Sequence, residues 1–200
     1  KPLVGDNVEI DILDEEKKLG NIRVILERKN ELIRPAVANI DQALVVFAVT
    51  KPKPHFNLLD RFLVMMECKE IPVVLVFNKK DIAEEQEIRE LQEAYNHLGY
   101  TVIFTSAKEE ENVELVKEVL EGKTTAVAGP SGVGKSSLIN LLQNGIEMET
   151  GSISEKIERG KHTTRHSELI PINETSYIMD TPGFSSLYVN EFEKEELKYY

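Results

Sequence analysis

The distribution of hydrophobic positions changes near residue 41, from strict alternation to continuous apolar runs. Residues 7–12 alternate between polar and apolar side chains, as expected for a half-buried strand, and a second strand of the same kind follows Gly20. Residues 1–38 therefore predict the last strands of a small β domain, too few to close a barrel by themselves.

Apolar runs alternate with amphipathic segments over the rest of the chain. Buried strands are predicted at 43–49, 72–77, 101–105 and 124–128, and helices at 56–69, 84–98, 110–121 and 134–144. Two further strands, at 166–172 and 175–180, follow each other without a helix and predict a hairpin that adds an antiparallel edge. This order predicts an α/β domain, about residues 39–190, with a mostly parallel sheet flanked by helices.

The loop between strand 124–128 and the next helix matches the pattern G-x-x-x-x-G-K-[ST]. It reads Gly129-Pro130-Ser131-Gly132-Val133-Gly134-Lys135-Ser136. Its glycines let the backbone curl so that N–H groups point at phosphate oxygens, and the helix N-terminus adds a partial positive charge. We expect Lys135 to reach the β- and γ-phosphates and Ser136 to offer its hydroxyl to Mg²⁺. The alternative, a glycine-rich turn before Lys-Ser, is disfavoured because the strand–helix context is also correct.

The segment Asn78-Lys79-Lys80-Asp81 directly follows strand 72–77 and fits the pattern N-K-x-D. A carboxylate at Asp81 can accept two hydrogen bonds from N1–H and the 2-amino group of guanine, and adenine has no such edge. We expect Asn78 to tie this loop to the phosphate loop, and the stem of Lys79 to cover the base plane. The alternative is a turn in which Asp81 is the N-cap of the next helix.

Two shorter motifs complete the predicted pocket. Backbone N–H groups of Ser106 and Ala107, at the end of strand 101–105, can reach the guanine carbonyl oxygen. In Asp180-Thr181-Pro182-Gly183, Asp180 can hold Mg²⁺ through a water and the Gly183 N–H can meet the γ-phosphate. Phe184 follows, where many GTPases carry the glutamine that orients the attacking water, and a phenyl ring cannot do this. Each motif is weak evidence by itself.

The segment from Gly160 to Arg165 lies where a switch threonine should complete the Mg²⁺ shell. Thr163 or Thr164 fits, and we assign the Mg²⁺ contact to Thr164 although the sequence does not exclude Thr163. Residues 156–166 carry four Lys or Arg against one Glu. They form either a solvated loop or a segment ordered by a triphosphate or by RNA phosphates.

Charge and composition narrow the class of protein. The net charge of −11 repels nucleic acid as a whole, so any RNA contact must use a local basic patch or segments beyond these residues. No apolar run is long enough to span a bilayer and no signal peptide is visible, so we expect a soluble cytoplasmic protein without membrane contact. The only cysteine, Cys68, excludes an internal disulfide and a cysteine-based zinc site.

The motifs occur in a circularly permuted order. The usual GTPase order begins with the phosphate loop, whereas here N-K-x-D comes first and Asp180 comes last. The pocket can tolerate this, because it needs only that the loops meet at the carboxyl edge of one sheet.

Two alternatives to a GTP-hydrolysing enzyme stay open. One is an ATP-using enzyme, such as a small-molecule kinase, and the other is a nucleotide-gated binding module with negligible hydrolysis.

The permuted order and four motifs together resemble the RsgA family (also YjeQ or YloQ) of ribosome small-subunit-dependent GTPases. The motifs are 34–41 (RPAVANID), 129–138 (GPSGVGKSSL), 160–166 (GKHTTRH) and 180–185 (DTPGFS). The second motif adds Ser137 to the predicted nucleotide site.

This resemblance implies a three-part protein: an OB-fold, of which residues 1–38 are a part, the permuted GTPase domain, and a C-terminal zinc-binding domain of which residues 191–200 are the start. Zinc is therefore expected only beyond Tyr200. The resemblance also implies GTP and GDP as ligands, action late in 30S subunit maturation, GTP hydrolysis stimulated by that subunit, and contact with 16S rRNA. His162 is then the catalytic residue that replaces the missing glutamine, and we expect a monomer.

Overall fold

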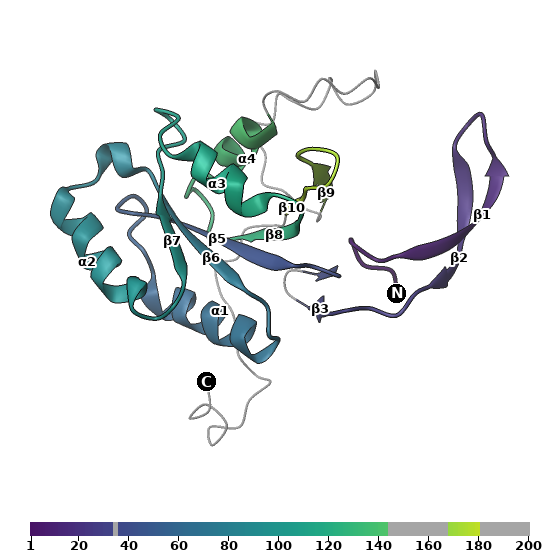
Figure 1. The fold of residues 1–200 in the computed structure, drawn as a ribbon, viewed down its shortest axis with the longest axis horizontal. Helices are drawn as coiled ribbons and strands as arrows, with labels where there is room; N and C mark the ends of the chain where they lie inside the picture. The colour runs from purple at the N-terminus through teal and green to yellow at the C-terminus, as the bar shows by residue number, and fades with distance from the viewer. Residues whose placement is uncertain (34–35, 144–167, 181–200) are drawn as a thin grey trace.

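A six-stranded sheet forms the centre of the computed structural model, which describes residues 1–33, 36–143 and 168–180 (Figure 1). Its strands, in the order β7-β6-β5-β8-β10-β9, are β7 (Thr101–Phe104), β6 (Val73–Asn78), β5 (Gln42–Ala48), β8 (Thr124–Ala128), β10 (Tyr177–Asp180) and β9 (Glu168–Pro171). All neighbours are parallel except β9 and β10. The predicted parallel sheet and its antiparallel edge are therefore confirmed.

Two helical layers cover the sheet. The helices α1 (Phe56–Cys68) and α2 (Glu85–Asn96) lie on one face, and α3 (Val113–Leu120) and α4 (Lys135–Gln143) lie on the other (Figure 1). Because side chains alternate along a strand, Val45 and Phe47 of β5 pack in the core under α1, whereas Leu44 and Val46 pack in the core under α3 and α4. All residues of β5 are buried, which explains its continuous apolar run.

Local capping decides where two helices begin. The Glu84 and Glu87 side chains form a reciprocal capping box at the start of α2. Asp81 instead lies in the 3-10 turn η1 (Lys80–Ile82), so the alternative in which Asp81 caps the next helix is wrong. α3 begins later than predicted because the backbones of Ser106 and Glu111 pair with each other and close the preceding residues into a turn.

The N-terminal part consists of two antiparallel pairs. β1 (Val8–Asp14) pairs with β2 (Leu19–Ile25) in a ribbon that projects away from the sheet, and β3 (Glu31–Leu32) pairs with β4 (Val37–Ala38) (Figure 1). Large apolar side chains of the ribbon, among them Ile12 and Ile22, are exposed. No described residue covers them, as expected for a β domain with too few strands to enclose a core.

Residues 3–6, here called the strap, fasten this part to the α/β domain. The Ala38 N–H donates to Val4 O at 2.9 Å, and the Asn39 side-chain amide donates to Gly5 O at 2.9 Å. Gly5 has a φ of +94°, and a Cβ there would overlap both Ala38 O and Met179 Cε. The strap therefore packs directly on Met179, the neighbour of Asp180 in β10.

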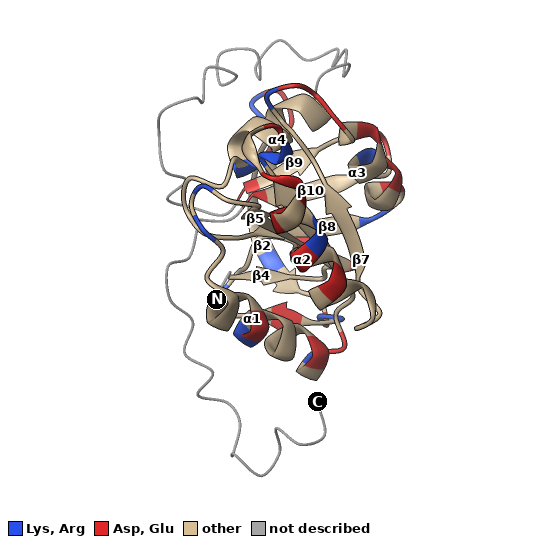
Figure 2. Ribbon diagram, turned by 90° about the vertical axis from the view of Figure 1, so that its left-hand side faces the viewer, with Lys and Arg blue, Asp and Glu red and all other residues tan. Residues whose placement is uncertain are grey.

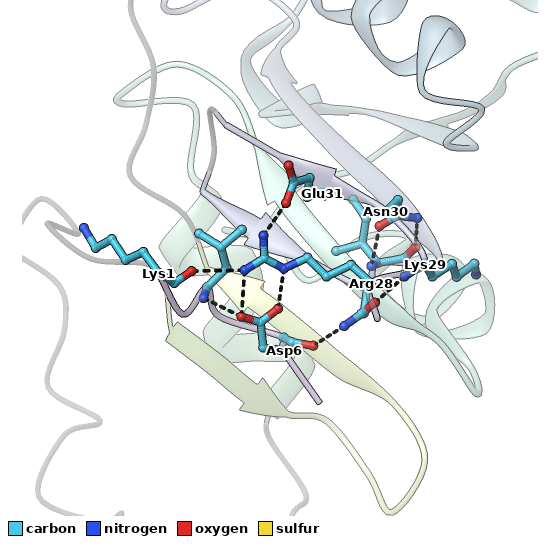
Figure 3. Close-up of polar contacts among 10 residues, drawn as sticks. Lys1, Asp6, Arg28, Lys29, Asn30 and Glu31 are labelled. Atoms are coloured by element: carbon cyan, nitrogen blue, oxygen red, sulfur yellow. Dashed lines mark hydrogen bonds and ion pairs between the residues drawn. The ribbon is translucent and has the colours of Figure 1, made fainter. Parts of the chain in front are cut away.

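Arg28 holds the end of the strap (Figure 3). Its guanidinium donates from Nε and Nη2 to the two carboxylate oxygens of Asp6, at 2.7 and 3.0 Å, and from Nη1 to Glu31. The hydrogen bonds from Arg28 lower the pKa of the Asp6 carboxyl group, with a further contribution from the Leu3 N–H. A forked pair of this kind fixes orientation as well as distance.

Asp41 joins the beginnings of two central strands. Its backbone N–H donates to Thr124 O, and its carboxylate accepts from the Thr124 N–H, both at 2.8 Å. Burial by itself would raise the pKa of Asp41, but the Thr124 N–H and the Lys29 ammonium outweigh it and lower the pKa.

Among the described residues, no helix combines the length and apolar character needed to cross a membrane.

We predict that Gly5→Ala lowers the free energy of unfolding by about 2–3 kcal/mol, because the new methyl group overlaps Ala38 O and Met179. The matched control is Gly99→Ala, where φ is +85° but no atom lies within 4 Å of the new Cβ. Backbone strain alone should make the control cost about 1 kcal/mol. Urea denaturation followed by circular dichroism measures both, and equal losses would contradict the packing of the strap.

Candidate nucleotide site

The loops that carry the predicted pocket meet at one edge of the sheet. β6, β5 and β8 are parallel neighbours, so their carboxyl ends point the same way. The N-K-x-D loop, residues 49–55 and the phosphate loop follow these ends in that order. Loops far apart in the sequence, and permuted in order, therefore lie side by side, as ligand-binding loops do in open α/β sheets.

Glycines allow the phosphate loop to pack tightly against its neighbours. Gly129 has a φ of +149°, and a Cβ there would overlap Val46 O of β5. Gly134 has a φ of +98°, and a Cβ there would overlap the side-chain amide of Asn78. The loop is thus a curled cradle whose glycines cannot be replaced without displacing β5 or Asn78, and this geometry fits a phosphate group.

Lys135 lies folded over this cradle. Its ammonium donates to Gly129 O and to Pro130 O, each at 2.8 Å. Burial lowers the pKa of Lys135, and the carboxylate of Asp180 opposes this shift only in part. A phosphate anion would supply a negative charge beside this half-buried ammonium.

The Asn78 side chain joins three parts of the site. It is 1% exposed. Its amide nitrogen donates to Val133 O at 2.9 Å, and its amide oxygen accepts from the Ala107 N–H at 3.0 Å and from the Thr105 hydroxyl at 3.2 Å. The tie between Asn78 and the phosphate loop that the sequence predicts is therefore present.

Lys79 makes a second bridge that the sequence did not predict. The residue has a φ of +66°, and its ammonium donates to Gly132 O at 2.6 Å and to Lys51 O at 2.7 Å. The predicted role, covering a base with the aliphatic stem, concerns other atoms of the side chain and stays a prediction. The sequence could not have predicted this bridge, because Lys51 belongs to no recognisable motif and its contact with Lys79 is visible only in the folded structure.

Ser106 orients the carboxylate of Asp81. The buried Ser106 hydroxyl donates to Asp81 Oδ1 at 2.7 Å and accepts from the Glu109 N–H at 3.1 Å, while Asp81 itself is exposed. The backbone amides predicted to meet a base have internal acceptors, since the Ser106 N–H donates to Glu111 O and the Ala107 N–H to Asn78. To bind a base, these amides would have to form bifurcated hydrogen bonds. The clearest contribution of Ser106 to the site is therefore its hydroxyl, which orients Asp81.

Two of the predicted Mg²⁺ ligands are described. Asp180, at the end of β10, is buried and pairs in register with Val127, two residues before Gly129, and Ser136 is exposed in the first turn of α4. Carboxylate and hydroxyl oxygens are the ligand types that Mg²⁺ takes, so these residues fit the ion. The described residues contain no cluster of three His, Cys, Asp or Glu that could hold a metal by itself.

The other predicted residues divide into two groups. Ser131 and Ser137 are described and exposed beside the cradle. His162, Thr163, Thr164 and Gly183 lie outside the described residues, as do Phe184 and residues 191–200.

Comparison with known proteins gives consistent matches. The family model described as RsgA GTPase matches residues 25–190. A protein of Agathobacter rectalis named "Small ribosomal subunit biogenesis GTPase RsgA" is 66% identical over 197 residues, which cover 98% of this chain and 65% of that protein. A protein of the same name from Alkaliphilus metalliredigens is 51% identical over 199 residues, or 68% of its length. The chain thus spans about two thirds of the length of these relatives.

Two solved structures are similar over the whole chain. The crystal structure of YjeQ from Thermotoga maritima has a TM-score of 0.80 and 40% identity, with 67% of that protein covered. The structure of YloQ, described as a circularly permuted GTPase, has a TM-score of 0.72 and 38% identity, with 63% covered. The permuted fold predicted from the motif order is therefore confirmed.

The lowered pKa of Lys135 predicts that nucleotide binding takes up protons at alkaline pH. Bound phosphates favour the ammonium and raise the pKa again, so affinity should fall as pH rises through the lowered pKa of the free protein. Calorimetry in two buffers of different ionisation enthalpy measures the proton uptake. Lys135→Arg, whose guanidinium stays charged, should abolish the uptake, and uptake that persists in this variant would assign it to another group.

Proposed function

Because the chain belongs to the RsgA GTPase family, whose model matches residues 25–190, we propose that it binds and hydrolyses GTP as a factor in late maturation of the small ribosomal subunit. Relatives that are 66% and 51% identical carry the name of a small-subunit biogenesis GTPase. The partner proposed is the 30S subunit, with 16S rRNA as the direct contact and the protein acting as a monomer.

The observation that carries this proposal is the direct connection between the base-reading loop and the phosphate loop. Asn78 donates to Val133 O, and Lys79 donates to Gly132 O. One purine nucleotide can therefore lie with its base at Asp81 and its phosphates in the cradle. An ATP-using enzyme would have no use for a carboxylate held by Ser106 at the base end.

Guanine selection follows from the exposed carboxylate of Asp81, which can still accept hydrogen bonds from a base. The Ser106 hydroxyl restrains one carboxylate oxygen, which fixes the orientation of the carboxylate plane. The carboxylate then accepts from N1–H and the 2-amino group of guanine. Adenine presents no matching pair of donors, so binding it would leave the carboxylate without its two partners.

Hydrolysis requires water to attack the γ-phosphorus in line with the bond to the β–γ bridging oxygen. The new oxygen–phosphorus bond forms as the bridging bond breaks, giving GDP and inorganic phosphate, and the water proton passes to His162 or to phosphate. Lys135 and the loop N–H groups stabilise the charge that develops on the phosphate oxygens. Ser136, Thr164 and, through a water, Asp180 would hold a Mg²⁺ ion, whose charge would offset that of the phosphates. Phe184 cannot orient the water, so we assign that role to His162.

Asp81→Asn should exchange the nucleotide preference. The amide cannot accept both guanine donors, so GTP affinity should fall about a hundredfold or more, while xanthosine triphosphate, which has a carbonyl in place of the 2-amino group, should gain affinity. Fluorescent nucleotide titrations measure both affinities. Unchanged GTP affinity would favour the ATP-using alternative.

Turnover should be slow in isolation and rise with added 30S subunits. GTP hydrolysis titrated with subunits, in the full-length protein, tests the proposed function directly. His162→Ala should remove the stimulated rate, by about 10²-fold or more for loss of a group that assists proton transfer, and leave GTP affinity unchanged. If His162→Ala left stimulation intact, the role of His162 would be abandoned, and absence of stimulation in the unaltered protein would count against the 30S subunit as partner.

A further inference from the structure

The loop that joins β5 to α1 carries a local positive charge beside the nucleotide site. Lys51, Lys53 and His55 are exposed in this loop, and no acidic residue occurs between Asp41 and Asp60. Figure 2 shows this loop marked in blue, whereas red positions gather on α2 and α3. In a chain of net charge −11, the positive charge of this loop favours the local approach of an anion.

The two lysines of this loop form no ion pair with another described residue. Several described basic side chains form ion pairs, such as Arg89 with Glu85 on α2 and Lys117 with Glu114 on α3. The ammonium groups of Lys51 and Lys53 have no carboxylate partner within the part of the chain that the structure describes. Ammonium groups of this kind can contact the phosphates of a polyanion and release small counterions.

The loop is also held in one shape. Pro52 and Pro54 restrict the backbone, and Lys51 O accepts from the Lys79 ammonium at 2.7 Å. His55 Nδ1 accepts from the Leu58 N–H at 3.2 Å, which leaves Nε2 as the nitrogen able to donate outward. Phe56 follows and is 49% exposed, so its ring is available for stacking against a base. Binding to this loop would cost little ordering entropy.

We propose that Lys51, Lys53, His55 and Phe56 form an RNA-contacting surface, with the lysines on backbone phosphates and Phe56 against an unpaired base. This inference rests on the proposed function, because a ribosomal subunit is the partner that presents RNA. Cations without carboxylate partners together with an exposed aromatic ring favour RNA over a protein partner, whose contacts would need an apolar centre. Through Lys79, which bonds both Lys51 O and Gly132 O, the surface borders the nucleotide site.

The test is the salt dependence of binding to purified 30S subunits, measured with the full-length protein. Lys53→Glu should reduce the slope of log affinity against log salt concentration by about 1, and Lys51→Glu/Lys53→Glu by about 2. Affinity at ~100 mM salt should fall roughly tenfold for the single variant and a hundredfold for the double. The matched controls are Arg89→Glu and Arg89→Glu/Lys117→Glu, which change charge equally on α2 and α3 and should alter neither quantity.

Two further measurements separate the possible causes. GTP affinity of Lys53→Glu should match the unaltered protein within about twofold, which establishes that the pocket is folded, and the corresponding glutamine variants should show smaller losses in the same order. Titration with protein-free 16S rRNA should reproduce the loss. A loss seen only with whole subunits would assign the surface to a ribosomal protein and overturn the proposal, as would unchanged slopes. If the unaltered protein bound the rRNA but not the subunit, the proposed function would fail while the RNA surface stood.

Discussion

The buried amide of Asn78 is the contact on which the rest of the site depends. Asn78 is the last residue of β6. Its side chain forms hydrogen bonds to Val133 in the phosphate loop and to Ala107 in the loop that follows β7. Gly134 leaves the space that the amide fills, since a side chain there would displace it. A buried amide with unsatisfied groups is costly, so the three loops are held in one arrangement before any ligand arrives.

This arrangement explains why a permuted chain order is tolerated. The site needs parallel strands whose carboxyl ends share an edge, and hydrogen bonds between their loops. Neither requirement depends on whether Lys135 follows or precedes Asp81 in the sequence. What the permuted order changes is the connection of the domain, because the N-terminal part now enters the sheet through β5, beside β8, where Asp41 bonds to Thr124.

Periodicity and motif spacing were sufficient to predict the six-stranded sheet, the β1–β2 pair, the helices and the loops at the sheet edge, because β5 and the phosphate loop carry strong, local signals. The short pair β3–β4 was not predicted. Contacts between distant segments gave no such signal. The bridge from Lys79 to Lys51 O uses a backbone carbonyl that any residue could supply. Ser106 was expected to act through its backbone. That its hydroxyl orients Asp81 follows only from the positions of the two side chains in the structure. Helix boundaries moved where capping by Glu84 or pairing of Ser106 with Glu111 competed with hydrophobic spacing.

The packing of Gly5 on Met179 has a consequence for the order in which the chain folds during synthesis. Met179 lies in β10, which completes the sheet between β8 and β9, so it leaves the ribosome long after Gly5. The strap cannot reach its final contacts until β10 has emerged, and until then Val4 and the core beneath it remain open to water. A pause in translation before β10 would therefore leave an incomplete sheet exposed, and nascent chains of that length are where chaperone binding or aggregation should concentrate.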